Sequence, residues 1–171
     1  MREARRAGVT TLHIRPAAVH DIAAVSDVLR EADSWLDQRE QALWRDDELQ
    51  PDRIASEVAH GLYWLAESSA GIRGTIRFQL DDPIFWPDAA PGEAAFIHRL
   101  AVRRSAAGGS VSVTLMQWAV DRTRTLGRQF LRLDCEATRP RLRAVYERFG
   151  FSYHSDRQVG PYHVARYEYR V

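Results

Sequence analysis

The chain has 171 residues, of which 45% are hydrophobic and 27% charged, and its formal net charge is +1. This composition is typical of a globular domain with a substantial core, and it excludes an intrinsically disordered chain. The nearly balanced charge gives no signature of nucleic-acid binding. No apolar run reaches the roughly 20 residues that a membrane-spanning helix needs.

Targeting and redox features favour the cytoplasm. Residues 1–10 are basic but lack the apolar region of a secretory signal, so we expect a flexible tail before a single domain at residues 11–171. The single cysteine, Cys135, cannot form an internal disulfide, as is typical of a reducing compartment. We therefore expect a cytoplasmic protein that binds neither nucleic acid nor membranes. The sequence leaves a monomer and a homodimer open.

The first part of the domain is predicted to be mainly helical. A short alternating strand over residues 12–16 ends at a proline. Apolar residues then recur at helical spacing over residues 19–36. A polar, acidic loop over residues 37–51 leads to a second helix over residues 52–60.

The middle of the chain is predicted to form strands. Residues 62–67 and 72–80 flank a short turn and have the pattern of a β-hairpin. Three prolines predict a loop over residues 81–92, and a strongly apolar strand follows over residues 94–102.

The last part alternates helices and strands. The whole order, β-α-α-β-β-β-α-β-α-β-β, predicts an α/β fold with a mixed central sheet and helices on both faces. The elements predicted here are helices over residues 110–126 and 139–149 and strands over residues 130–135, 151–155 and 163–169. The first of these helices is expected to bury Val113, Leu115, Met116, Ala119, Val120 and Thr123.

The connection between strand 94–102 and helix 110–126 is a basic turn with paired glycines. Backbone N–H groups in such a turn, backed by a helix N-terminus, form a site for a phosphate or pyrophosphate. Small residues at this place are also ordinary turn chemistry, so the segment alone leaves both interpretations open. The residues concerned are Ala107, Gly108, Gly109, Ser110, Val111 and Ser112.

Two motifs point to one family. The first is His98-Arg99-Leu100-Ala101-Val102, and the second, preceded by Leu142, is Tyr146-Glu147-Arg148-Phe149-Gly150-Phe151. With the order of elements over residues 12–171, they resemble the GNAT superfamily of N-acetyltransferases. The resemblance implies transfer of an acetyl group from acetyl-CoA to the primary amine of a small molecule, by direct attack in a ternary complex.

The resemblance also implies a site. Strand 94–102 should splay from strand 130–135, with pantetheine between them and a backbone N–H stabilising the oxyanion. Tyr146 aligns with a tyrosine that protonates the departing thiolate, a role that suits a phenol of pKa about 10. The implied donor site comprises Leu100, Ala101, Val102, Ala107, Gly108, Gly109, Ser110, Val111, Ser112, Arg139 and Leu142.

The glycine-containing loop departs from the family pattern. Ala107 replaces a glutamine or arginine, and serines stand at two positions that are glycine or alanine in the family. Arg139 stands where an asparagine often contacts pantetheine. One alternative is therefore a GNAT-fold binding or regulatory protein with a degenerate pyrophosphate loop and no acetyl transfer. Another is an acyltransferase that uses a different donor or a protein N-terminus.

His98 is the candidate general base, because a neutral imidazole accepts a proton near pH 7. Its position resembles that of a histidine in the arylalkylamine acetyltransferase branch. Alternatively, the ring only packs or hydrogen-bonds. Strand alternation predicts one face made of Phe96, His98, Leu100 and Val102. Weaker candidates for the base are Asp134, Glu136 and Glu93.

The acceptor pocket is expected in the first two helices and the nearby loops. Aromatic rings beside carboxylates there suit a cationic amine, although acidic loops are also common without a ligand. The six histidines lack metal-binding spacing, so no metal is predicted. Cys135 as a covalent acyl carrier lacks a local base. The substrate-binding residues expected are Trp35, Trp86 and Asp134.

Overall fold

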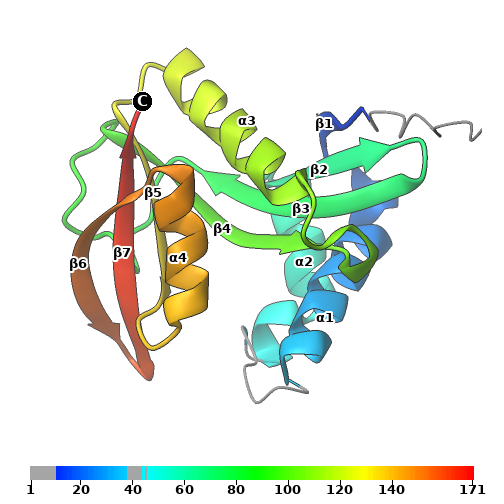
Figure 1. The fold of residues 1–171 in the computed structure, drawn as a ribbon, viewed down its shortest axis with the longest axis horizontal. Helices are drawn as coiled ribbons and strands as arrows, with labels where there is room; N and C mark the ends of the chain where they lie inside the picture. The colour runs from blue at the N-terminus through cyan, green and yellow to red at the C-terminus, as the bar shows by residue number, and fades with distance from the viewer. Residues whose placement is uncertain (1–10, 38–43, 45) are drawn as a thin grey trace, which may run out of the picture.

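A computed structural model describes residues 11–37, 44 and 46–171, which form one mixed sheet with helices on both faces (Figure 1). The sheet has seven strands in the order β1-β2-β3-β4-β5-β7-β6. The predicted fold class and order of elements are confirmed, and the predicted tail at residues 1–10 lies outside the described residues. The strands are β1 His13–Pro16, β2 Tyr63–Ser68, β3 Gly71–Gln79, β4 Ala94–Val102, β5 Phe130–Glu136, β6 Ser152–Val159 and β7 Tyr162–Arg170. The α-helices are α1 Ile22–Asp37, α2 Pro51–Ala59, α3 Val111–Thr125 and α4 Pro140–Phe149, with short 3-10 helices at Val19–Asp21, Asp46–Leu49 and Arg104–Ala106.

Two hydrophobic cores lie on opposite faces of the sheet. Leu115 and Met116 of α3 pack over one face, together with the inner side of α4. Leu29 of α1 and Ile54 of α2 pack over the other face. The predicted buried side of α3 is correct except for Val113, which is 51% exposed because it faces away from the sheet.

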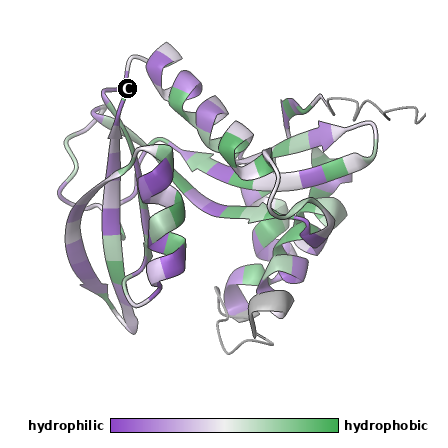
Figure 2. Ribbon diagram, in the orientation of Figure 1, coloured by the Kyte–Doolittle hydropathy of each residue, from purple (hydrophilic) through white to green (hydrophobic). Residues whose placement is uncertain are grey.

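Hydropathy along the ribbon distinguishes the edge of the sheet from its interior. The edge strand β6 is hydrophilic along most of its length, as is typical of an edge that must avoid pairing with other chains (Figure 2). Within the part of the chain that the structure describes, no helix combines the length and the apolar character needed to cross a membrane.

The sheet opens between β4 and β5. These strands are parallel, and their pairing runs only from Ala94 and Phe130 to Phe96 and Arg132. Beyond that point the two strands diverge, although each continues to its own end (Figure 1). The expected splaying of these two strands is confirmed, and it leaves a gap in the middle of the sheet.

A β-bulge at Arg99 reverses the alternation of β4. Arg99 has φ of 48°, and the register with β3 shifts there, so that β4 carries one extra residue. Before the bulge Phe96 packs with Trp86, away from α3, whereas after it Leu100 and Val102 pack toward α3. The prediction that Phe96 and His98 share a face with Leu100 and Val102 is therefore wrong, because a bulge breaks the two-residue period.

Candidate active site

A cavity of about 680 Å³ occupies the opening between β4 and β5. It passes from one side of the sheet to the other: Leu142 and Tyr146 of α4 line it on one side, and His98 and Asp134 on the other. Leu100 also lines it, beside the point where the strands separate. The structure thus brings together predicted residues from three separate elements.

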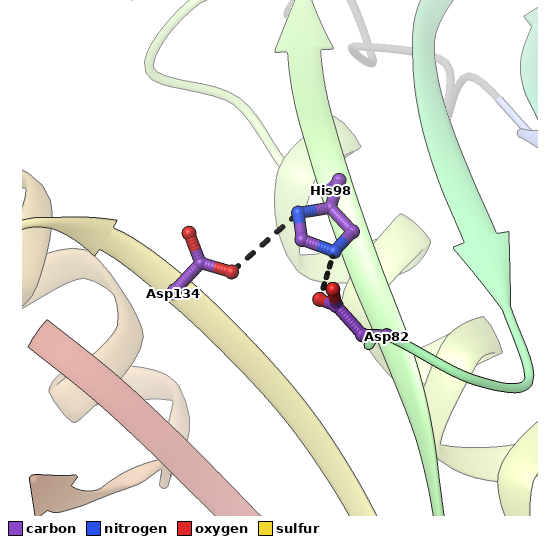
Figure 3. Close-up of side chains that lie close together, drawn as sticks. All are labelled: Asp82, His98 and Asp134. Atoms are coloured by element: carbon purple, nitrogen blue, oxygen red, sulfur yellow. Dashed lines mark hydrogen bonds and ion pairs between the residues drawn. The ribbon is translucent and has the colours of Figure 1, made fainter. Parts of the chain in front are cut away.

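His98 lies between two carboxylates, one at each ring nitrogen (Figure 3). Its Nε2 is 2.7 Å from Oδ2 of Asp82, and its Nδ1 is 3.6 Å from Oδ1 of Asp134. A hydrogen bond donated by Nε2–H to Asp82 leaves the lone pair of a neutral ring on Nδ1. The nitrogen that can accept a proton is then the one facing β5 across the opening.

Burial and charge act together on the pKa values of this cluster. Burial disfavours the imidazolium, but Asp134 and Asp82 outweigh that effect and raise the pKa of His98 above its ordinary value. Burial, opposed by His98 and reinforced by Asp82, raises the pKa of Asp134 to about 6. Both shifts favour the binding of a proton within the cluster.

Asp82 is a functional candidate that the sequence analysis did not single out from the other acidic residues of the loops. It follows β3, is 5% exposed, and its Oδ1 accepts a hydrogen bond from the backbone N–H of Phe85 at 3.1 Å. This bond fixes a turn that aims Oδ2 at His98. An aspartate before a proline is a known turn signal, so the turn could have been expected, but not the contact with a residue 16 positions later.

Tyr146 lies on α4 with its ring packed edge-on against Phe151, at 6.1 Å between ring centroids. It also contacts the ring of Tyr167 and lines the cavity. Burial raises the pKa of its phenol, with smaller contributions from Cys135 and Asp134. The phenol therefore remains protonated at neutral pH, as a proton donor must.

The predicted phosphate loop is exposed at the start of α3. Residues 107–110 are solvent-exposed, and Gly108 has φ of 78°, which favours glycine. The first turn of α3, which lies within the described residues, carries no acidic side chain. Free N–H groups at the start of a helix attract anions, so these residues fit the diphosphate of CoA.

The remaining predicted donor residues have mixed environments. Ala101 packs toward α1 and α2, on the side opposite Leu100, and Val111 is buried beside Gly74. These two residues can therefore contribute backbone groups rather than side chains to a donor site. Arg139 precedes α4 and lines the cavity, where it donates a 2.6 Å hydrogen bond to Glu136.

Trp86, one of the two tryptophans predicted to bind the acceptor, does not line the cavity. Trp86 is 2% exposed, and its ring packs with Phe96 beneath the guanidinium groups of two arginines, so its assignment to the acceptor pocket was wrong. A large ring in a proline-rich loop can bury itself as an anchor, and sequence alone does not distinguish this from a binding role. The side chain of Trp35 lies outside the described residues. Besides Tyr146, the aromatic residues Trp44, Phe85 and Tyr162 line the cavity.

Two of the weaker candidates for the general base form ion pairs with arginines, and the thiol of Cys135 is a poor nucleophile. Glu93 pairs with Arg132 at 3.0 Å, away from the cavity. Glu136 lines the cavity but pairs with Arg139. Burial raises the pKa of Cys135 to about 12, which opposes formation of a nucleophilic thiolate.

Asp82, His98 and Asp134 are also close enough to hold a metal ion, because one ligand atom from each lies within 4.8 Å of the others. However, the two carboxylates face different nitrogens of the ring. A single ion binds only one of these nitrogens, so it would displace one carboxylate from its present place. The observed geometry suits proton sharing rather than metal binding.

The sheet order, the opening between β4 and β5 and the loop before α3 define the N-acetyltransferase class of α/β proteins. The model of the acetyltransferase (GNAT) family matches residues 23–151, and the chain belongs to this family. YesJ, an uncharacterised N-acetyltransferase of Bacillus subtilis (strain 168), is 33% identical over 72 residues, which cover 42% of this chain and 40% of YesJ. The matched stretch thus spans less than half the length of that curated relative.

Solved structures share the fold over nearly the whole chain. A GNAT-family acetyltransferase from Listeria monocytogenes has a TM-score of 0.80 at 22% identity and covers 96% of this chain and 97% of its own. The PaiA N-acetyltransferase from Thermoplasma acidophilum, solved in complex with coenzyme A, has a TM-score of 0.72 at 15% identity, with 93% and 99% covered. At these identities the likeness shows the shared fold.

Proposed function

We propose that this protein transfers the acetyl group of acetyl-CoA to the primary amine of a small molecule in a ternary complex. The observation that carries the proposal is a cavity at the split in the sheet whose lining includes Tyr146 on one side and His98 on the other. Family membership and the coenzyme A complex of the Thermoplasma relative support CoA as the carrier. When bound, acetyl-CoA would supply a thioester whose C–S bond is exchanged for a C–N bond.

The residues of this chain would hold and move protons. His98 Nδ1 takes a proton from the attacking amine, while Asp82 holds the ring through Nε2 and Asp134 stabilises the imidazolium. Tyr146 donates its phenolic proton where the thiolate leaves. Donor binding falls to the loop Ala107–Ser112, the backbone of β4 near Leu100, and Leu142 and Arg139 of the α4 region.

Two measurements on the purified protein test the proposal. Calorimetric titration with acetyl-CoA, and separately with CoA, should give a Kd on the order of micromolar. Thiol release from acetyl-CoA should then require an added amine and produce one acetylated amine for each thiol. Absence of binding at millimolar ligand would show that the departures in the Ala107–Ser112 loop abolish the phosphate site, and a GNAT-fold protein without acetyl transfer would remain. Binding with amine-independent hydrolysis alone would also contradict the proposal.

A further inference from the structure

Arg77 presents an unused hydrogen-bond donor at the edge of the cavity. This residue of β3 lines the cavity with 19% of its side chain exposed. Its Nε is buried and has no hydrogen-bond partner among the described residues. Its Nη1 lies 3.5 Å from Oε1 of Glu57, which is a long ion pair. Burying a charged donor without a partner is costly, so a ligand that supplies an acceptor here would gain affinity.

The carboxylate of Glu57 is already shared. Arg99 donates to it at 2.9 Å and Arg53 at 3.3 Å, so one carboxylate serves three guanidinium groups when Arg77 is included. Glu48 also lines this end of the cavity and adds a second carboxylate. Among these described side chains three positive charges face two negative ones. Arg77 therefore shares the carboxylate of Glu57 with two other guanidinium groups, which leaves it only partly neutralised.

The adjacent part of the cavity, around His98, carries two carboxylates. His98 there is flanked by Asp82 and Asp134. Arg77 and His98 are directly opposite each other in the antiparallel pairing of β3 and β4. Opposed residues in such a pair have Cβ atoms roughly 5 Å apart and point to the same face. A cationic group and a proton acceptor thus lie side by side, within the span of one small molecule.

We propose that the acetyl acceptor is an amine that also carries an anionic group, such as the carboxylate of an amino acid, and that Arg77 binds this group while the amine lies beside His98. The inference rests on the proposed function and adds the substrate class. The planar guanidinium offers Nε and an Nη as parallel donors, which match the two oxygens of a carboxylate. A carboxamide tail would offer this pair of donors only one acceptor oxygen and no charge.

Matched acceptor pairs test the inference. The L-amino acids and their carboxamides differ in the charge of the tail, and thiol release gives kcat/KM for each pair. We expect the best acids to exceed their amides by about 10-fold or more. Arg77→Gln should bring this ratio close to one, and Arg77→Lys should leave a smaller preference because a point charge replaces the fork. Arg73→Gln, four residues earlier on β3 and outside the cavity, should preserve the ratio.

Equal rates for acids and amides would overturn the inference while leaving acetyl transfer intact. An equal loss of kcat/KM for acid and amide in Arg77→Gln would also overturn it, because a purely structural role of Arg77 leaves the ratio of the two unchanged. If no member of either series releases thiol, the result counts against the proposed function for these acceptors. Calorimetry with N-acetyl amino acids and their amides then decides the inference separately: tighter binding of the acids, lost in Arg77→Gln, supports it, and equal binding refutes it.

Discussion

The Nε2 atom of His98 lies 2.7 Å from Oδ2 of Asp82, although the two residues belong to a strand and to the loop before it. Asp82 is 5% exposed and is itself held by a backbone N–H, so it can orient the ring without rearranging. Because Nε2 is committed to this hydrogen bond, proton exchange is directed to Nδ1. The hydrogen bond from Nε2 to Asp82 thus determines which ring nitrogen of His98 exchanges the proton.

Asp82→Asn should lower kcat/KM by about 10- to 100-fold, since a neutral amide orients the ring less well and no longer stabilises the imidazolium. Loss of the carboxylate lowers the pKa of His98, so the acidic limb of the pH–rate profile should move to lower pH. The profile of kcat/KM between pH 5 and 9 measures both effects. The control, Asp81→Asn, removes the adjacent charge, and an equal shift in that variant would contradict a specific role for Asp82.

Tyr146→Phe should reduce kcat by about 100-fold, because the departing sulfur loses its proton donor while the ring still packs against Phe151. Calorimetry should show an unchanged Kd for CoA. Tyr153→Phe, which removes an exposed hydroxyl on β6, should keep full activity. Normal turnover in Tyr146→Phe would remove this tyrosine from the mechanism.

Asp134→Asn should stabilise the fold at pH 8 and impair activity. The folded protein binds this proton more tightly than the unfolded chain, since the pKa rises from 3.8 to about 6. The free energy of unfolding therefore falls as pH rises through this window, and the variant escapes that loss, gaining up to about 3 kcal/mol. Urea unfolding at pH 4 and pH 8 measures the difference, which should be small at pH 4. A variant less stable than the wild type at pH 8 would refute the assignment.

Ala107→Arg should tighten CoA binding by about fivefold, because an exposed guanidinium would join the backbone donors at the start of α3. Calorimetric titration with CoA is the direct measurement. Ala70→Arg adds the same charge in the exposed turn between β2 and β3 and should leave the Kd unchanged. An unchanged or weaker affinity in Ala107→Arg would show that this loop is aligned incorrectly with the phosphate site.

Arg99→Met should lower the free energy of unfolding by about 3 kcal/mol, because the buried carboxylate of Glu57 loses its shortest charged contact. Methionine replaces much of the volume, which separates the loss of charge from the loss of packing. Denaturant unfolding measures the effect. Arg141→Met on the exposed surface of α4 should change stability by less than about 0.5 kcal/mol.

Local pattern in the sequence determined the order of the elements. Gly127 and Gly150 stand just past the ends of α3 and α4 with φ of 69° and 123°, values that glycine tolerates and other residues rarely adopt. Helical and strand periodicities likewise depend on residues close together in the chain. The segments that carry the donor loop, His98 and Tyr146 were therefore correctly placed on their elements from sequence alone.

Only the tertiary structure decided which side chains meet. Arg99, at the bulge, forms hydrogen bonds with Glu57 of α2 and Tyr63 of β2. No pattern of residues within β4 therefore predicts that Leu100 lies on the other face. The burial of Trp86 and the contact between Asp82 and His98 depend on how one loop folds back over the sheet. Long-range packing sets these features, and its energy is not encoded in any short segment.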